Sequence, residues 1–247
     1  MQTLTIATYN IHKGFSHFNR RVVVHELRDR LRELNADMVF LQEVQGEHAS
    51  HVRRFHNYPS CAQHEFIAEE IWPHHAYGKN SVYEAGHHGN AILSRFPILQ
   101  SRNKDVSAHR FESRGLLHCE VEISGQRIYC LCVHFGLFAK GRREQTSMLI
   151  KHVNEEIPAD APLIIAGDFN DWRNQMSHTL AMELNVNDAF HLDKGGPARS
   201  FPARLPLFRL DRIYVRGFSV QHSEVHVGGS WQRLSDHAAL SARLGIS

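Results

Sequence analysis

Short apolar runs of the length of buried strands recur from the beginning of the chain to its end, and a polar cluster adjoins many of them. Runs of about four to eight apolar residues bounded by turn residues are typical of strands in a buried sheet. Five of the adjoining clusters combine acid, amide and imidazole groups: they are Thr8-Tyr9-Asn10, Leu41-Gln42-Glu43, Gly167-Asp168-Phe169-Asn170, Leu210-Asp211-Arg212 and Ser235-Asp236-His237. Because each cluster stands at a strand end, the pattern favours stacked sheets with one polar site at their edge.

The strands account for most of the predicted structure. We expect them at 3–10, 38–41, 90–94, 116–123, 127–135, 163–166, 211–215, 219–227 and 238–244. Ser124-Gly125 supplies the turn chemistry of a hairpin between the fourth and fifth of these strands. The strands are distributed over the whole sequence, so no part of the chain stands out as a separate helical domain.

Two long helices and one short helix are expected. Apolar residues recur at helical spacing between Arg20 and Leu34, and a second helix is predicted over 142–157. The polar, His-rich stretch 44–89 is expected to hold one short helix near 65–71. No linker, repeat or low-complexity tract interrupts the order of elements, which indicates a single α/β domain over residues 1–247.

Composition excludes several classes of protein. With 42% hydrophobic residues the chain can bury a core, and its formal net charge of +2 is too small to indicate a nucleic-acid or membrane partner by itself. No stretch approaches the ~20 apolar residues of a membrane-spanning helix, and no export signal opens the chain. The four cysteines and the 20 histidines lack the spacing of a zinc or redox site. We expect a cytoplasmic, reduced monomer.

Three residues in the clusters offer hard oxygen ligands. Glu43 and Asp236 supply carboxylates, and Asn10 supplies an amide oxygen. Mg²⁺ and Mn²⁺ prefer such ligands and bind through few carboxylates while they keep several waters. A divalent metal would shield the charge of a phosphoester during hydrolysis.

The other polar residues fit the remaining steps of phosphoester hydrolysis. Asp168 is expected to accept a proton from the attacking water or to orient it. Asn170 is expected to donate its amide to a phosphate oxygen, and His134 and His237 are expected to donate as imidazolium ions. A carboxylate such as Asp211 would fix the tautomer of one histidine and raise its pKa.

Each of these residues also has an ordinary structural explanation. Asn10 can close the first strand, Glu43 can be a surface acid, and Asp168 with Asn170 can form an Asx turn. His134 can be a hydrogen-bonded histidine at a sheet edge. Their shared placement at strand ends favours one site over independent coincidences. The chain has neither a complete P-loop nor a Gly-x-Ser-x-Gly elbow.

The ordered motifs resemble those of the endonuclease/exonuclease/phosphatase superfamily, which includes deoxyribonuclease, exonuclease III-type endonucleases, neutral sphingomyelinases and inositol-polyphosphate phosphatases. The matching segments are Thr8-Tyr9-Asn10-Ile11, Leu41-Gln42-Glu43, Gly89-Asn90-Ala91-Ile92-Leu93-Ser94-Arg95, His134, Gly167-Asp168-Phe169-Asn170, Leu210-Asp211-Arg212-Ile213 and Ser235-Asp236-His237. They cover nearly the whole chain, and segments 10–15 and 86–90 are similar to uncharacterised bacterial members. The resemblance implies an α/β (α+β) fold, a four-layer αββα sandwich in which helices flank two packed, mostly antiparallel sheets.

The resemblance also implies how the site residues divide the work. It places Mg²⁺ at Glu43, assisted by the amide and the second carboxylate of the proposed ligand set. Asp168 and Asn170 would handle the water and the transition state, and Asp211 would pair with His237. These assignments agree with the chemistry of the residues.

The substrate is less constrained than the reaction. Abasic endonucleases have a tyrosine where this chain has His134, whereas deoxyribonuclease-like enzymes and sphingomyelinases have a histidine. Arg114 resembles the family's phosphate-facing arginine, although a surface salt bridge would also explain it. The segment 195–209 is either a proline-stiffened passive loop or a basic lip in which Arg199 and Arg204 contact substrate phosphates.

Together these observations predict a divalent-metal-dependent phosphodiester hydrolase that acts on nucleic acid, with DNA as the first candidate. A phosphatase or phosphodiesterase acting on phospholipid head groups or inositol phosphates is the enzymatic alternative. A module that binds phosphorylated ligands without turnover is the non-enzymatic alternative.

Overall fold

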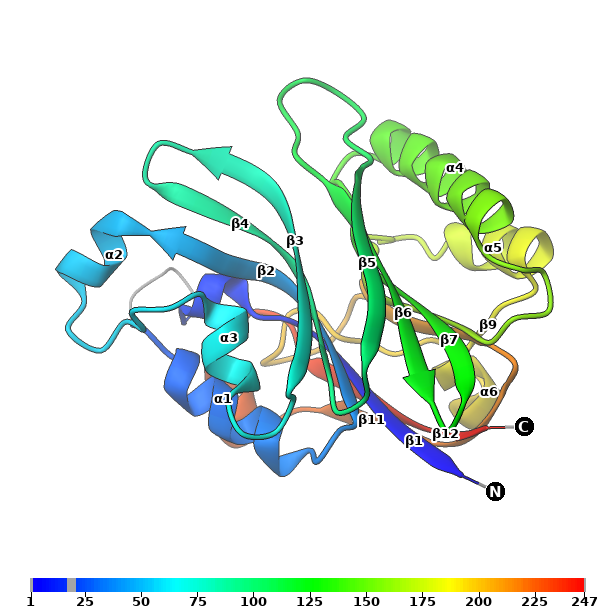
Figure 1. The fold of residues 1–247 in the computed structure, drawn as a ribbon. Coiled ribbons are helices and arrows are strands. Elements are labelled where there is room, and N and C mark those ends of the chain that lie inside the picture. The colour runs from blue at the N-terminus through cyan, green and yellow to red at the C-terminus, as the bar shows by residue number, and fades with distance from the viewer. Residues whose placement is uncertain (1, 17–20, 247) are drawn as a thin grey trace.

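The computed structural model describes residues 2–16 and 21–246, and it contains two six-stranded sheets packed face to face (Figure 1). The first sheet has the order β11-β12-β1-β2-β4-β3, with β1 (Thr3–Asn10), β2 (Met38–His48), β3 (His74–Tyr83), β4 (Gly86–Ser94), β11 (Phe218–His226) and β12 (Ala239–Ile246). The second has the order β5-β6-β7-β8-β10-β9, with β5 (Ile98–Asp105), β6 (Gly115–Ile123), β7 (Gln126–His134), β8 (Leu163–Asp168), β9 (Asn187–Asp188) and β10 (Asp211–Arg216). Each sheet has one parallel pair, β1 with β2 and β7 with β8, and its other neighbours are antiparallel.

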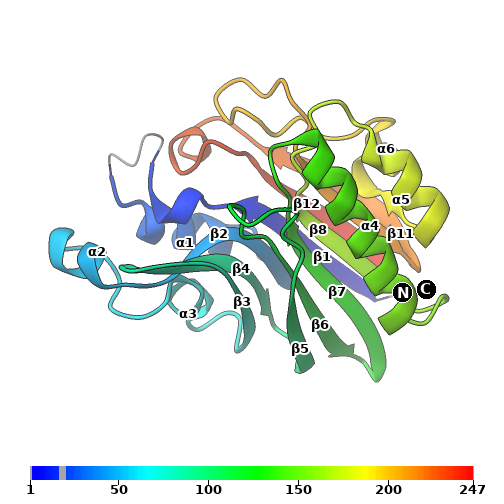
Figure 2. The ribbon, with the colours of Figure 1, turned by 90° about the horizontal axis from the view of Figure 1, so that it is seen from above.

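Helices form the two outer layers. The α-helices are α1 (Val24–Glu33), α2 (Ala49–Arg54), α3 (Gln63–Ala68), α4 (Ala139–Glu156), α5 (Met176–Leu184) and α6 (Ala189–Lys194), and short 3₁₀ turns are η1 (His12–Gly14) and η3 (Trp231–Arg233). Helices α1 and α3 lie on one side of the pair of sheets, and α4 and α5 lie on the other (Figure 2). The structure thus confirms the predicted four-layer sandwich. None of the helices in the described ranges has the length and apolar character needed to cross a bilayer.

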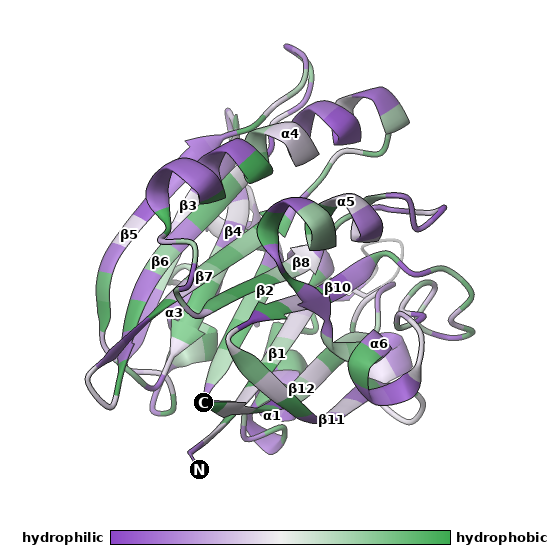
Figure 3. Cartoon of the chain, turned by 90° about the vertical axis from the view of Figure 1, so that its right-hand side faces the viewer, coloured by the Kyte–Doolittle hydropathy of each residue, from purple (hydrophilic) through white to green (hydrophobic). Residues whose placement is uncertain are grey.

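The central strands are apolar on both faces because both faces are buried. In β2, Met38 and Phe40 enter the core between the sheets, whereas Val39 and Leu41 pack against the helical layer. Successive side chains of a strand point to opposite faces, so a continuous apolar run is what such a strand requires. The same pattern makes β2, β7 and β8 largely hydrophobic, while α4 carries many hydrophilic residues (Figure 3).

Several expected element boundaries were wrong. The short helix expected near 65–71 is α3, but the stretch 44–89 also contains the end of β2, helix α2, strand β3 and the first residues of β4. Strand β5 was also missed, because every residue after Ile98 is exposed and those from Gln100 to Asp105 are polar. The predicted helix from Arg20 begins at Val24, and Arg20 itself lies outside the described residues. Helices α5 and α6, which follow the Gly-Asp-Phe-Asn cluster, were not predicted.

Candidate active site

The predicted catalytic residues lie at one end of the two sheets. His134 ends β7 and Asp168 ends β8, and the parallel register places the two residues opposite one another. The antiparallel strand β10 begins with Asp211, which lies opposite Asp168 on its other side. Asn10 ends β1 in the first sheet, and its Nδ2 is 3.2 Å from Asp168 Oδ2. The site is therefore built from both sheets.

A glycine lets the central strand of the site approach its neighbour. Gly167 directly precedes Asp168 and has φ of 148°. A Cβ atom at Gly167 would lie 2.0 Å from the carbonyl oxygen of Val133 in β7. Only glycine adopts this conformation and contact readily. This explains why a glycine precedes Asp168 in the sequence motif.

Asp168 is at the centre of the site and is almost completely buried. Its Oδ1 accepts a hydrogen bond from the Asn170 backbone N–H at 2.9 Å, and its Oδ2 accepts one from Asn10 Nδ2. His134 Nε2 and His237 Nε2 lie 3.4 and 3.7 Å from the same Oδ2. Burial raises the pKa of Asp168 to about 7, although the charge of His237 opposes the shift. A carboxylate with such a pKa can exchange a proton near neutral pH.

Asn170 holds the turn that follows Asp168. Its backbone is left-handed, with φ of 49°, a conformation that asparagine tolerates better than most residues. Its Nδ2 donates to the carbonyl oxygen of Phe135 at 3.0 Å and lies 3.5 Å from Asp168 Oδ2. The Asn170 amide is thus engaged within the turn, and its contact with a phosphate remains a prediction.

Asp211 and His237 form the shortest side-chain contact of the site. Asp211 Oδ2 and His237 Nδ1 are 2.8 Å apart, and Phe201 packs its ring 5.0 Å from the imidazole. Burial disfavours the charged imidazole, but Asp211 and Asp168 outweigh this effect and raise the pKa of His237 to about 10. His237 is therefore an imidazolium at neutral pH, with Nε2 directed to the Asp168 side.

His134 has the opposite electrostatic character. Burial lowers the pKa of His134 well below its ordinary value, and the nearby Arg114, His237 and His88 lower it further. The structure therefore favours a neutral imidazole at His134, instead of the imidazolium expected from the sequence. A neutral ring can still donate one N–H to a phosphate oxygen.

Glu43 and Asp236 provide two less buried carboxylates beside Asn10. Strand β2 shifts its register against β4 at this point, and Glu43 has a left-handed φ of 55°. Its Oε1 is 3.4 Å from Asn10 Nδ2. Ser235 Oγ links Asn10 to Asp236, because it lies 2.7 Å from the Asn10 carbonyl oxygen and 3.3 Å from Asp236 Oδ1. The side chains of Glu43 and Asp236 are 19% and 21% exposed, so both can reach a ligand that enters from solvent.

Two basic residues of η1 contact these carboxylates. Lys13 Nζ is 3.6 Å from Glu43 Oε2, and His12 Nδ1 is 3.4 Å from Asp236 Oδ1. The backbone N–H of His12 also donates to Asn10 Oδ1 at 3.1 Å. The sequence reasoning assigned no role to His12 or Lys13, although both directly follow the Asn10 cluster. That adjacency was the signal which could have identified them.

Two groups of side chains could hold a divalent metal. Ligand atoms of Asp168, Asp211 and His237 all lie within 4.8 Å of one another. His237 Nδ1 is already bonded to Asp211, however, and a protonated imidazole is not a ligand. The set of Glu43, Asp236 and Asn10 offers only oxygen atoms, which are the donors that Mg²⁺ and Mn²⁺ prefer. The chemistry of this second set fits the predicted metal better.

The three predicted substrate-binding arginines differ in their surroundings. Arg114 is half-buried, and its charge acts on His134 and His88. Its Nε is buried and has no hydrogen-bond partner among the residues that the structure describes. Arg199 and Arg204 are exposed, and no hydrogen bond or ion pair found in the described ranges joins them to the catalytic side chains.

The loop that carries Arg199 and Arg204 is nevertheless attached to the site. The backbone N–H of Ala203 donates to the Asp236 carbonyl oxygen at 2.7 Å, and Ala238 donates to the Ser200 carbonyl oxygen at the same distance. Within the loop, Phe201 and Phe208 pair as a β-bridge, and Trp172 packs against both rings. The loop is thus an ordered wall next to Asp236 and His237.

Comparison with known proteins agrees with this geometry. The family described as Endonuclease/Exonuclease/phosphatase family matches residues 7–237. The chain belongs to that family. Members of the family generally hydrolyse phosphoesters and typically use divalent metals. The match begins just before the Asn10 cluster and ends at His237, so it contains every candidate metal and catalytic residue.

One curated relative and two solved structures show how far the family likeness extends. The chain is 46% identical over 243 residues to the uncharacterized protein YbhP of Escherichia coli K12, covering 98% of this chain and 96% of the relative. An endonuclease/exonuclease/phosphatase structure from Beutenbergia cavernae has a TM-score of 0.82 at 19% identity, covering 100% of this chain and 72% of that one. A D. rerio TDP2 complex with a single-strand DNA product has a TM-score of 0.70 at 19% identity, covering 100% of both chains. At such low identity, the likeness to solved structures shows the shared fold alone.

Proposed function

We propose that this family member is a divalent-metal-dependent phosphodiester hydrolase whose first substrate class is nucleic acid. The observation that carries the proposal is that one site holds a buried, proton-exchanging carboxylate and, beside it, two partly exposed carboxylates. A buried carboxylate with a pKa of about 7, Asp168, lies between two imidazoles, and the partly exposed carboxylates Glu43 and Asp236 lie beside it. Such an arrangement separates proton transfer from metal binding within one site.

The roles of the residues follow from their protonation states. Asp168 accepts a proton from the attacking water, because its carboxylate is ionised in part of the population at neutral pH. The His237 imidazolium donates through Nε2 to a phosphate oxygen, and Asp211 orients the ring through Nδ1. Asn10 holds Asp168 in place. A Mg²⁺ or Mn²⁺ ion held by Glu43, Asp236 and Asn10 would supply charge neutralisation at the phosphate.

The proposal is tested by a substrate panel with the purified protein and Mg²⁺. We expect hydrolysis of bis-p-nitrophenyl phosphate and faster hydrolysis of single-stranded DNA, plasmid DNA or RNA. Faster turnover of p-nitrophenyl phosphate than of the diester would instead identify a monoesterase. A protein that binds phosphorylated ligands but hydrolyses no member of the panel would contradict the proposal.

A second substrate class is favoured by exposed apolar side chains near the site. Phe111 and Phe138 are 81% and 71% exposed, and together with Arg114 they line a hollow of about 310 Å³. Leu205, in the loop beside Asp236, is 65% exposed. Exposed apolar side chains beside a basic residue such as Arg114 are suited to a lipid surface, although Glu112 also lines the hollow. Preferential hydrolysis of phospholipids in anionic vesicles over DNA would therefore favour a lipid head-group phosphodiesterase.

The loop arginines should affect polymers and spare small diesters. The Arg199→Ala and Arg204→Ala variants should each raise KM for long DNA and lower the slope of log affinity against log salt by about 1, because each phosphate contact releases counterions. Hydrolysis of bis-p-nitrophenyl phosphate should stay at the wild-type rate. The control is Arg243→Ala, which removes an equal charge from an exposed position in β12. If all three variants behave alike on DNA, the loop is a passive wall and its arginines do not bind substrate.

A further inference from the structure

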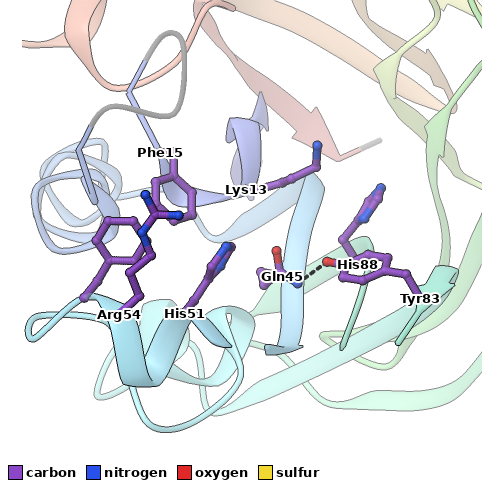
Figure 4. A pocket seen from close by; sticks show the side chains of 8 residues that line it. Lys13, Phe15, Gln45, His51, Arg54, Tyr83 and His88 are labelled. Carbon is purple, nitrogen blue, oxygen red and sulfur yellow. Dashed lines mark hydrogen bonds between the residues drawn. The ribbon is translucent and has the colours of Figure 1, made fainter. Parts of the chain in front are cut away.

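A cationic pocket lies directly beside the Glu43 carboxylate and takes no part in the mechanism described above. Its volume is about 320 Å³. The side chains that line it come from η1 and the residue after it, from β2, from α2 and its C-terminal end, and from β3 and β4 (Figure 4). They are Lys13, Phe15, Gln45, His51, Arg54, Phe55, Tyr83 and His88.

The charged side chains that line this pocket are basic. They are Lys13 and Arg54, and none of the acidic residues that the structure describes lines it. Lys13 also reaches the edge of the metal set, with its Nζ 3.6 Å from Glu43 Oε2, so the pocket and the proposed metal site are neighbours. Because no acidic side chain of the described residues lines the pocket beside Arg54, Arg54 offers a site for an anion, while Lys13 adds a second positive charge at the edge that the pocket shares with Glu43. Phosphate is the anion that the proposed function places at the adjoining site.

Several polar atoms around the pocket have no partner in the part of the chain that the structure describes. Gln45 is completely buried, and its Nε2 donates to the Tyr83 hydroxyl and to the His87 carbonyl oxygen. These bonds fix the amide so that Oε1 remains as an unpaired acceptor. His51 Nδ1 is also buried and unpaired, and burial lowers the pKa of His51 to about 4, so the ring is a neutral hydrogen-bonding group. Buried polar atoms of this kind are normally satisfied by a ligand or water.

The remaining wall is aromatic. Tyr83 is 37% exposed, and Phe55 is half-buried at the end of α2. Aromatic faces next to a cationic groove are the usual means by which proteins hold a flat base beside its phosphate. The pocket thus combines a site for an anion, an acceptor for an N–H or O–H donor, and an apolar surface for a planar group.

We infer that this pocket binds the nucleotide adjacent to the scissile phosphate. Its phosphate would contact Arg54, a hydroxyl or amino group would donate to Gln45 Oε1, and the base would lie against Tyr83 and Phe55. The inference rests on the proposed function for the identity of the neighbouring scissile group. It makes the substrate a nucleic acid with at least two phosphates, one at each site.

Binding of a mononucleotide tests the pocket without turnover. Isothermal titration calorimetry in metal-free buffer should show that adenosine monophosphate binds at least about tenfold more tightly than adenosine, because a charge-assisted contact is added. Arg54→Ala should remove about tenfold of the affinity for adenosine monophosphate. Arg54 is exposed, so its loss should leave the unfolding temperature unchanged. The matched control Arg53→Ala changes the same charge on the same helix at a residue that does not line the pocket, and it should bind like wild type.

Two results would overturn the inference. Equal affinity of the Arg54→Ala and wild-type proteins for adenosine monophosphate would show that the nucleotide binds elsewhere. Equal wild-type affinity for ribose 5-phosphate and adenosine monophosphate would show that the aromatic wall does not take a base. Failure of the proposed function is distinguishable, because a protein without diesterase activity could still bind the mononucleotide in an Arg54-dependent manner. In an active protein, Arg54→Ala should raise KM for oligonucleotides and leave hydrolysis of bis-p-nitrophenyl phosphate unchanged.

Discussion

Asp168→Asn should reduce turnover of any diester substrate by about a hundredfold or more, since it removes the acceptor for the water proton. The geometry gives a second reason for a large effect. Asp168 Oδ2 lies within reach of donors from Asn10, His134 and His237, and the asparagine amide group would place a further N–H among them. The variant therefore loses both the proton acceptor and the arrangement of the surrounding donors.

The same substitution should leave the fold intact. Burial raises the pKa of Asp168 to about 7, so the folded protein holds this proton more tightly than the unfolded chain does. Stability therefore falls as the pH rises from the unfolded pKa through 7, because folding then requires a buried charge. Asparagine removes that cost. At pH 8 the unfolding temperature of Asp168→Asn should equal or exceed that of the wild type, measured by circular dichroism.

A neighbouring aspartate provides the matched control for this experiment. Asp171 is also buried, but its Oδ2 accepts a hydrogen bond from the Met176 backbone N–H at the start of α5. Asp171→Asn should lower stability and keep turnover near the wild-type rate. His237→Ala should match Asp168→Asn in its loss of turnover, because it removes the imidazolium that faces the same carboxylate. If both catalytic variants retain near-wild-type rates, the reaction takes place elsewhere on the protein.

The sequence was most informative where strands are buried on both faces. Met38 to Leu41 and Leu163 to Ala166 could be recognised because every side chain of these runs is apolar, and the polar groups that follow had to stand at the edge of the sheets. The placement of polar clusters at strand ends, together with the family resemblance, predicts that Asp168, Asp211 and His237 lie close together. The register of β7, β8 and β10 explains how that proximity arises.

Other features depend on contacts that a sequence pattern does not contain. The edge strands β3 and β5 are rich in polar residues, so their periodicity carries no signal of burial. The protonation states of His134 and His237 differ because only His237 has Asp211 against its Nδ1. The neighbouring pocket is lined by both Lys13 and Arg54, which are 41 positions apart in the chain, and Phe15 after η1 packs against His51 of α2 between them (Figure 4).

Chelation of divalent metal should abolish turnover, and added Mg²⁺ or Mn²⁺ should restore it. The proposed ligands are hard oxygen atoms of Glu43, Asp236 and Asn10, and the first two side chains are accessible from solvent. Without a metal, the negative charge of the phosphate would face both carboxylates. The nearby Lys13 and His12 could offset that repulsion only in part, because each already contacts one of the carboxylates. Loss of a metal that stabilises the transition state costs several kcal/mol, or about a thousandfold or more in rate.

Glu43→Gln separates this metal site from the alternative at Asp168, Asp211 and His237. The amide keeps the shape of the side chain and removes its charge, so the Mg²⁺ concentration required for half-maximal turnover should rise at least about tenfold. Mg²⁺ should also raise the unfolding temperature of the wild type more than that of Glu43→Gln, which measures binding independently of turnover. The control is Glu47→Gln, an exposed glutamate on the same strand, which should leave both quantities unchanged. Full turnover in EDTA-treated protein would remove the metal from the mechanism. Unaltered Mg²⁺ dependence of the Glu43→Gln variant would instead place the metal at the buried group of Asp168, Asp211 and His237. There, protonation of His237 and binding of the ion would compete directly.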